Sequence, residues 1–344
     1  MIYKTIIRPI LFLLSPENAH DLIFYIISRI TFLYPLFKIL YSPKETWEEI
    51  DINGLKFKNR IGIAAGLDKD GIAIRFFDSI GFSHIEVGTV TPLPQPGNPK
   101  PRLFRLVKDE ALINRMGFNN IGADKLRENI LKARKKLSTD FIIGVNIGKN
   151  KDTPIENAAE DYKLCIEKLF DAADFFTINI SSPNTENLRT LQNEIYLDNL
   201  LKIISDTNEE EAKKHNVPAK NIFLKIAPDL IEEEIENIYF TAAKYKLSGI
   251  VATNTTITRN NLLTDIDETG GLSGKPLKPI SEVILKKLYD LNLNSPYSRL
   301  YLIGSGGVFS KEDYKEKLIV GADLVQIYTG YIYEGNGILK KLLK

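Results

Sequence analysis

The residues best suited to chemistry in this chain form one short segment, Asn179 to Thr185, which reads NISSPNT. It follows an apolar run, Phe175–Ile178, that is typical of a buried strand. The segment offers two amides, two serine hydroxyls and a threonine hydroxyl on a backbone that Pro183 stiffens. Asn, Ser and Pro also form plain turns whose side chains bond their own backbone. This segment alone is compatible with a plain turn and with a set of ligand-binding groups that includes a base.

The same arrangement recurs along the chain. Short apolar runs alternate with segments of helical periodicity, which is typical of βαβ units on a parallel sheet. Each run ends in a polar or glycine-rich loop. The runs are Ile61–Ala64, His84–Val87, Ile142–Val145, Phe175–Ile178, Ile222–Leu224, Ile250–Ala252, Leu300–Ile303 and Leu324–Ile327. Eight runs predict a (β/α)₈ TIM barrel with its active site where the strands end. A doubly wound open sheet is the alternative, although no loop resembles its dinucleotide fingerprint.

The last two loops suggest one ligand group. Ser305–Gly307 and Tyr328–Gly330 are short and contain glycine. Glycine lets backbone N–H groups approach an anion closely, and the loops after strands seven and eight often hold a phosphate in such barrels. Glycine also serves tight turns, but the position of these loops in the strand order favours a phosphate-bearing ligand.

Composition excludes several classes of protein. The 344 residues suit one barrel of about 250 residues with additions. A formal net charge of +1 provides no field for holding nucleic acid. The single cysteine, Cys165, lies at helical spacing among apolar residues and is expected in the core, so the chain alone forms no disulfide or iron–sulfur cluster. The three histidines have no metal-ligand spacing, and we expect no metal. His84 is expected to pack at a strand start, and His215 to lie at a polar helix end.

Residues 1–43 differ from the rest and are expected to form a separate unit before a catalytic barrel of residues 44–344. Ser15-Pro16-Glu17 is a helix-initiating turn, and Leu22–Tyr41 is apolar on almost every side. The segment lacks the small-residue cleavage site of a signal peptide and carries too many charges for a membrane span. We therefore expect two helices that lie in a membrane interface. A helical cap on the barrel bottom is the alternative.

With these residues laid out, the chain closely resembles the dihydroorotate dehydrogenases, specifically the membrane-associated, quinone-dependent class (class 2). The resemblance runs from Ser15 to the C-terminus and rests on many motifs in order. They are AAGLDKDG at 64–71, GTVT at 88–91, PQPGN at 94–98, PRLFRL at 101–106, NRMGFNN at 114–120, NIGKNKD at 146–152, NISSPNT at 179–185, LRTL at 188–191, KIAPDL at 225–230, ATNTT at 252–256, GGLSG at 270–274 and VQIYT at 325–329.

The resemblance implies the roles of individual residues. One non-covalent FMN per chain would lie across the barrel mouth, at Ala65, Gly66, Leu67, Asp68, Lys69, Thr89, Asn146, Asn179, Lys225, Thr253, Gly274, Gly307, Tyr328 and Thr329. The planar, anionic orotate would be held by Lys69, Asn114, Arg115, Met116, Gly117, Phe118, Asn179, Asn184, Asn254 and Thr255. Ser182 matches the base that removes the C5 proton of (S)-dihydroorotate while hydride leaves C6 for the flavin. Thr185 and Phe118 match positions that organise a water beside that serine.

The resemblance also implies the electron acceptor. The soluble classes use cysteine as the base and the membrane class uses serine, so Ser182 indicates the quinone class. The N-terminal helices would form the funnel for a membrane quinone, with His20, Arg105 and Tyr328 near its head group. The implied protein is a peripheral enzyme of pyrimidine (UMP) biosynthesis on the cytoplasmic side of the cell membrane, and we expect a monomer that contacts lipid through its N-terminal helices.

Two other functions stay open from the residues alone. One is a phosphate-binding TIM-barrel lyase or synthase that works without flavin. The other is a non-catalytic membrane-associated scaffold that keeps the fold. Only the dehydrogenase predicts bound flavin, so a visible spectrum of the purified protein separates the three.

Overall fold

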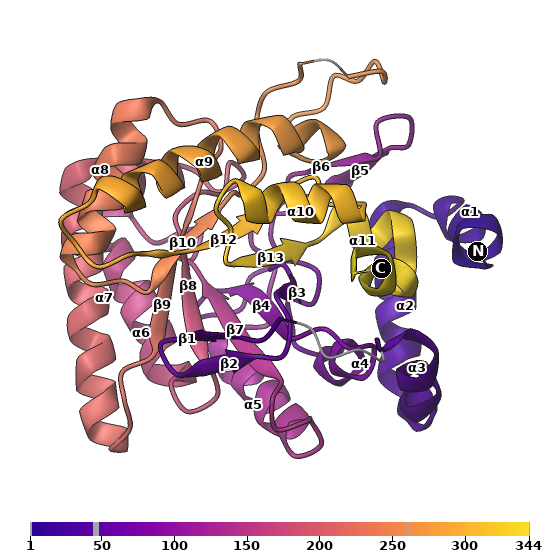
Figure 1. Cartoon of the computed structure of the whole chain (residues 1–344), viewed down its shortest axis with the longest axis horizontal. Coiled ribbons are helices and arrows are strands. Elements are labelled where there is room, and N and C mark those ends of the chain that lie inside the picture. Colours follow the sequence, from indigo (N-terminus) through magenta and orange to yellow (C-terminus); the bar gives the residue numbers. More distant parts are fainter. Residues whose placement is uncertain (1, 44–47, 261, 344) are drawn as a thin grey trace.

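The structure is a computed structural model that describes residues 2–43, 48–260 and 262–343. Its centre is a closed barrel of eight parallel strands, each hydrogen-bonded to its neighbours in chain order (Figure 1). The strands are β3 (Ile61–Ile63), β4 (His84–Val90), β7 (Ile142–Ile147), β8 (Phe175–Asn179), β9 (Asn221–Ile226), β10 (Gly249–Ala252), β12 (Tyr301–Ser305) and β13 (Leu324–Ile327). All eight overlap the predicted runs, so the predicted TIM barrel is confirmed.

A helix follows every barrel strand and covers its outer face. The helices are α4 (Ile74–Ser79), α5 (Ala123–Arg134), α6 (Ala158–Leu169), α7 (Glu194–His215), α8 (Glu232–Lys244), α9 (Lys278–Asn294), α10 (Lys311–Ile319), α11 (Thr329–Glu334) and a final α12 (Ile338–Leu343), with short turns η3 (Ile155–Asn157), η4 (Leu188–Gln192), η5 (Lys275–Leu277) and η6 (Gly335–Gly337). One apolar core fills the space between strands and helices. Cys165 is fully buried in it, as predicted.

The histidine predictions outside the site are also confirmed. His84 is the first residue of β4 and is fully buried, and burial lowers its pKa to about 3. His215 is the last residue of α7, where its ring stacks on Phe170.

A hairpin that was not among the predicted elements closes the N-terminal end of the barrel. It consists of β1 (Ile50–Ile52) and β2 (Leu55–Phe57), which pair antiparallel. Ile52 and Phe57 are fully buried there and pack with inward-facing residues of the barrel strands, among them Phe175. The barrel bottom is therefore covered by strands, and the alternative of a helical cap on the bottom is wrong.

A second addition lies at the other end of the barrel. β5 (Leu103–Leu106), β6 (Ala111–Asn114) and β11 (Gly271–Gly274) form an antiparallel three-stranded sheet in the order β11-β6-β5. Two of its strands come from the loop after β4 and the third from the loop after β10. The sheet has a small apolar core of its own. It carries Asn114 and Gly274 to the rim of the barrel mouth.

The N-terminal extension lies against the side of the barrel, beside α4 and the C-terminal helices (Figure 1). It consists of η1 (Tyr3–Ile7), α1 (Arg8–Phe12), α2 (Pro16–Arg29), η2 (Thr31–Leu33) and α3 (Tyr34–Tyr41). The Ser15 side chain accepts from the N–H of Asn18, so the predicted helix start is confirmed. The expected domain boundary after residue 43 borders residues 44–47, which lie outside the described residues.

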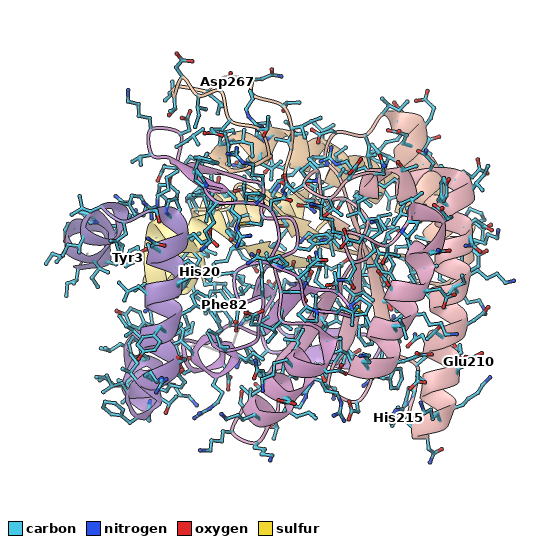
Figure 2. All side chains as sticks on the ribbon, turned by 180° about the vertical axis from the view of Figure 1, so that it is seen from behind. Tyr3, His20, Phe82, Glu210, His215 and Asp267 are labelled. Atoms are coloured by element: carbon cyan, nitrogen blue, oxygen red, sulfur yellow. The ribbon has the colours of Figure 1, made fainter. Side chains whose placement is uncertain are left out.

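One face of the extension is buried against the barrel. Phe24 and Tyr34 are almost fully buried, and their rings contact Phe77 and Phe76 of α4. Figure 2 shows His20 on the side of α2 that faces the barrel and Tyr3 beside the C-terminal helices. The Tyr3 hydroxyl donates to the Ile332 carbonyl of α11. The extension is therefore packed onto the catalytic unit along its length.

The opposite face of the extension is apolar and open to solvent. Its exposed large side chains are Ile2, Ile6, Ile7, Ile10, Leu13, Leu14, Leu22, Tyr25, Ile26, Phe32, Leu36, Ile39 and Leu40. Within the described residues, no single helix is long and apolar enough to cross a membrane; the pair Tyr3–Phe12 and Pro16–Arg29, bent by 120°, meets that test only when taken together.

Candidate active site

A large cavity opens at the C-terminal ends of the barrel strands, where the sequence predicts the active site. It holds about 1020 Å³ of empty space, counting its open mouth. Nineteen of the predicted substrate, cofactor and catalytic residues line it: Ala65, Gly66, Lys69, Thr89, Asn114, Met116, Gly117, Phe118, Asn179, Ser182, Asn184, Lys225, Thr253, Asn254, Thr255, Gly274, Gly307, Tyr328 and Thr329.

Ser182 lies in the loop after β8 and is 6% exposed. Its Oγ accepts a hydrogen bond from the N–H of Asn184 at 3.2 Å. The hydroxyl of the neighbouring Thr185 is buried and has no hydrogen-bond partner in the part of the chain that the structure describes. An unpaired buried hydroxyl is costly, and an ordered water commonly satisfies such a group.

Arg189 holds the loop that carries Ser182. Its guanidinium donates to the carbonyl of Ser181 at 3.1 Å and to the carbonyl of Thr255 at 3.2 Å. The same group pairs with Asp229 of the loop after β9, at 2.9 Å. One side chain therefore joins three loops of the barrel mouth and fixes the loop of Ser182 against the loop of Asn254 and Thr255.

Asparagine amides dominate the polar wall of the cavity. The Asn184 side chain donates to the Oδ1 of Asn114 at 3.1 Å, which joins the β8 loop to the three-stranded sheet. The Asn254 side chain donates to the hydroxyl of Ser181 at 3.0 Å. Amides offer both donors and acceptors, so this wall suits a flat ring edged with N–H, carbonyl and carboxylate groups.

Lys69 supplies a cation to the same cavity. Its ammonium donates to the Oδ1 of Asn119 at 2.7 Å. Burial, and then the neighbouring Arg102 guanidinium, lower the pKa of Lys69 to about 8. A bound anion would offset both effects, because an opposite charge nearby favours the charged form of a lysine.

The glycine loops form the part of the cavity predicted to take a phosphate. Gly307 has a φ of +74°, and a Cβ placed on it would lie 2.3 Å from the Cβ of Lys278. Glycine is therefore required there by conformation and by space. Lys278 is the first residue of α9, so the N-terminal end of a 17-residue helix lies against this loop. Backbone N–H groups at such helix ends favour anions.

Four predicted site residues do not line the cavity. Asn146 lies one layer behind the wall, with its side chain bonded to Thr89 and Asn179. The Asp68 carboxylate accepts from two backbone N–H groups at the start of α4, and burial raises its pKa to about 6. Leu67 is buried beside it. Arg115 pairs with Glu268 outside the cavity. Contacts of these four with a ligand stay predictions.

Nine cavity residues were not among the predicted site residues. They are Ala64, Ser273, Leu277, Ser305, Gly306, Val308, Gln326, Ile327 and Gly330. Three of them, Ser305, Gly306 and Gly330, lie in the glycine loops already singled out. Gln326 carried a signal that was overlooked, because it is a polar residue inside the apolar run Leu324–Ile327. Nothing in the sequence indicated that Leu277 or Ser273 would reach the cavity.

A second, smaller cavity lies between α2 and the barrel mouth. It holds about 530 Å³, counting its opening, and its wall includes His20, Phe24 and Tyr328. The Nε2 of His20 lies 2.7 Å from the carbonyl oxygen of Leu67, and its ring stacks on Phe24. The residues that line both cavities are Gly66, Lys69, Met116 and Tyr328. The two spaces therefore share a wall.

Arg105, the third predicted quinone-site residue, does not line this second cavity. Its guanidinium donates to the carbonyls of Phe12 and Leu14, at 3.2 and 2.8 Å. The same group lies 4.4 Å from the centre of the Phe12 ring. Arg105 thus binds the C-terminal end of α1. Its contact with a quinone stays a prediction.

The fold and this site define a TIM-barrel enzyme with a small-molecule cavity at its mouth, and comparisons with known proteins give its family. The family model described as dihydroorotate dehydrogenase matches residues 48–344. The dihydroorotate dehydrogenase (quinone) of Aliivibrio salmonicida (strain LFI1238) is 47% identical over 347 residues, which cover 100% of this chain and 99% of the relative. The protein of the same name from Escherichia coli (strain K12 / DH10B) is 47% identical over 345 residues, covering 99% of each.

Solved structures agree. The crystal structure of DHODH from Eimeria tenella in complex with ferulenol has a TM-score of 0.84 and 36% identity, and the match covers 95% of this chain and 89% of that one. The ligand-free form has a TM-score of 0.83 and 37% identity, with 95% and 92% covered. The chain therefore belongs to the dihydroorotate dehydrogenase family, in its quinone-dependent class. The flavin-free lyase or synthase alternative does not fit this family.

Proposed function

We propose that the cavity at the barrel mouth binds dihydroorotate against an FMN, and that Ser182 is the base of the reaction. As a member of its family the chain is an oxidoreductase that converts dihydroorotate to orotate in pyrimidine biosynthesis. The observation that carries the proposal is the convergence of Ser182, Lys69 and four asparagines (Asn114, Asn179, Asn184 and Asn254) on one cavity that the glycine loops border.

Three polar parts of the cavity wall match groups of FMN. The Oε1 of Gln326 is buried and has no partner among the described residues, and it matches the N–H of an imide edge. The ammonium of Lys225, on β9, matches a ring carbonyl. The loop of Gly307 and the start of α9 match a phosphate. When bound, FMN supplies the acceptor for the hydride that leaves C6 of the substrate. We expect one non-covalent FMN per chain.

Ser182 performs the proton transfer in this proposal. A free serine hydroxyl is a poor base, so it needs a group that takes its proton onward. The unpaired hydroxyl of Thr185 and the ring of Phe118 flank this region, and a water bonded to Thr185 would lead the proton away from the cavity. Ser182 Oγ accepts a hydrogen bond from the backbone N–H of Asn184 at 3.2 Å and makes no other within the described residues, which leaves it free to face C5.

The asparagines and Lys69 orient the substrate. Asn184 and Asn114 are bonded to each other, and Asn254 is bonded to the Ser181 hydroxyl, so the amides are fixed before the ligand arrives. Pre-ordered groups lower the entropy lost on binding and hold C5 and C6 in place. The ammonium of Lys69 neutralises the carboxylate of dihydroorotate. The three-stranded sheet above the mouth limits access of water.

The second cavity is proposed as the path of the quinone. It lies between α2 and the barrel mouth and shares a wall with the first cavity, so an acceptor bound there approaches the flavin without displacing orotate. His20 and Tyr328 provide polar groups for its head. The exposed apolar face of the extension would contact the lipid that holds the quinone tail. We propose a monomer that is attached peripherally to the cytoplasmic side of the cell membrane.

One experiment tests the core of this proposal. The purified protein is expected to be yellow and to release FMN, and no FAD, on denaturation, because one phosphate cradle is present and the Rossmann fingerprint is missing from the sequence. Anaerobic addition of dihydroorotate is expected to bleach the flavin absorbance. A colourless protein that ignores added FMN, or a flavin that dihydroorotate does not bleach, would contradict it.

A further inference from the structure

A single buried carboxylate underlies the floor of the large cavity. Glu86 lies on β4 with a fully buried side chain inside the barrel. Its Oε1 accepts from the Nδ2 of Asn146 at 2.6 Å, and its Oε2 accepts from the Nε2 of Gln326 at 2.7 Å. The Lys225 ammonium lies 4.0 Å from Oε1. Charged groups are rarely buried without partners, and Glu86 has partners on three other strands.

A carboxylate that accepts on both oxygens dictates which way its amide partners point. Asn146 must turn its N–H₂ group toward Glu86, so its Oδ1 is left to accept from Thr89 and from Asn179, the latter at 3.0 Å. The Oδ1 of Asn179 in turn accepts from the Ser181 hydroxyl at 3.1 Å. The hydrogen bonds therefore form one series in which Ser181 donates to Asn179, Asn179 donates to Asn146, and Asn146 donates to Glu86.

Gln326 is oriented by the same carboxylate. Its N–H₂ group is committed to Glu86, so its Oε1 is the side-chain atom left without a bond from that carboxylate, and Gln326 is one of the residues that line the cavity. That oxygen is buried and unpaired with respect to the described residues. Burying an unpaired acceptor is unfavourable, so a site that keeps one is suited to a ligand that brings the donor.

We propose that Glu86 is a positioning residue that fixes the donor and acceptor pattern of the cavity floor for the imide edge of a flavin ring. It presents Gln326 as an acceptor and holds Lys225 in the barrel as a cation. It also sets the orientation of Asn146 and Asn179. The inference rests on the proposed function, since it takes FMN to be the ligand. A purely structural Glu86 would instead affect only the folding of the barrel.

The isosteric variant Glu86→Gln separates these two roles. Its new N–H₂ group would meet the N–H₂ group of either Asn146 or Gln326. Reorienting Gln326 is the easier response, because the Asn146 oxygen already holds two donors and the Gln326 oxygen holds none. The wall then presents a donor where the native protein presents an acceptor.

We expect the affinity of the apoprotein for FMN to fall by about 10- to 100-fold in Glu86→Gln, because the imide N–H would face another donor and stay buried without a partner. The double variant Glu86→Gln with Gln326→Glu restores an acceptor and a negative charge to the same space. It is expected to regain affinity to within a few-fold of the native protein. Gln326→Met, which removes the acceptor and leaves Glu86 in place, is expected to weaken FMN binding by about tenfold.

The experiment is a titration of full-length apoprotein with FMN, followed by quenching of flavin fluorescence, together with thermal unfolding of each apoprotein. Asp323→Asn is the matched control. Asp323 is a buried acceptor-only carboxylate in the segment between α10 and β13, bonded to the N–H of Leu302 and to Arg299, and it does not line the cavity. It is expected to lower thermal stability and leave FMN affinity unchanged.

The outcomes are distinct. Native affinity in Glu86→Gln, or a double variant no better than the single one, would overturn the inference. If Glu86→Gln does not fold, Gln326→Met decides, and native affinity in that variant would overturn it equally. A native apoprotein that does not bind FMN would instead contradict the proposed function.

Discussion

The barrel and the N-terminal extension of this chain differ in how many large apolar side chains they expose and in how these are distributed. Within the described residues, thirteen exposed large apolar side chains lie between Ile2 and Leu40, and fifteen are spread over all the rest. The fifteen of the barrel are distributed between Ile72 and Ile319, alone or in small groups such as Phe240 and Tyr297, which is normal for a protein surface. The extension gathers them on one face while its other face is packed on α4. A concentrated apolar face of this kind is typical of a surface that contacts a membrane or another protein.

The polar side chains that line the two cavities are concentrated in the barrel instead. Lys69, Ser182 and four asparagines line the cavity at the barrel mouth, whereas the extension provides Glu17, His20 and Asp21 to the second cavity. Even the basic residues of the extension are partly used internally, since Lys4 pairs with Glu334 and Arg8 donates to the Tyr333 carbonyl. The comparison supports the proposed division of roles, in which the barrel binds a water-soluble substrate and the extension serves a lipid-soluble acceptor.

The largest expected effect is that of Ser182→Ala on the barrel side. We expect reduction of the flavin by dihydroorotate to slow by roughly 10²–10⁴-fold, the usual contribution of a positioned base. FMN and orotate should still bind, because within the described residues the Ser182 hydroxyl holds the loop only through the bond that it accepts from the Asn184 N–H. Rapid-mixing spectroscopy measures the rate, and an unchanged rate would mean that the base lies elsewhere.

Removal of residues 1–43 tests the extension side. Dihydroorotate should still reduce the flavin, because no barrel strand or βα loop lies in that segment. Activity with a long-tailed quinone should fall by at least about tenfold relative to activity with a small soluble dye, since losing one Leu-sized apolar contact already has that effect. The truncated protein exposes Phe76 and Phe77, so it is assayed in mild detergent. An unchanged quinone-to-dye ratio would make the extension only a structural cover.

The charge on Lys69 should make the affinity of the barrel cavity for orotate depend on pH. Its pKa of about 8 is below the ordinary value, so the ammonium is present below pH 8 and is lost as the pH rises through it. The affinity for anionic orotate should therefore fall by about tenfold between pH 7 and 9. Titration of orotate at several pH values measures this. Lys69→Met should bind weakly at every pH, and a pH profile that keeps its inflection in this variant would exclude Lys69 as its cause.

The smallest effect compares two isoleucines of similar exposure. Ile39 of α3 is 71% exposed and Ile319 of α10 is 77% exposed. Ile39→Ser should weaken binding to lipid vesicles by several-fold, because its side chain would leave the lipid. Ile319→Ser should leave vesicle binding unchanged. Equal effects of the two substitutions in a vesicle sedimentation assay would argue against the extension as the membrane contact.

The sequence predicted the barrel well because its eight apolar runs and their polar loop ends are local patterns. The β1–β2 hairpin was not predicted, although its sequence carries a signal: Asn53-Gly54 lies between two short segments in which apolar and charged residues alternate, Ile50–Ile52 and Leu55–Phe57. Glu86 was also overlooked as a functional residue, although a charge inside an apolar run is itself a signal. Its role depends on Asn146, Gln326 and Lys225, which meet only when the barrel closes.

Site residues in loops were predictable where the loop itself reaches the cavity. Those in the three-stranded sheet were harder, because Ser273 reaches the site only when β11 pairs with β6 across more than 150 residues of chain. The second cavity was anticipated through His20 and Tyr328. The binding of Arg105 to the end of α1 was not anticipated, since it depends on how the extension docks.

The central claim is that two regions carry two half-reactions, and rapid anaerobic mixing of full-length protein tests it most directly. Flavin absorbance is followed first with dihydroorotate and then, from the reduced protein, with quinone. Ser182→Ala should slow only the first step, and His20→Ala, in the wall of the second cavity, should slow only the second. If both substitutions slow the same step and spare the other, the division between barrel and extension is contradicted.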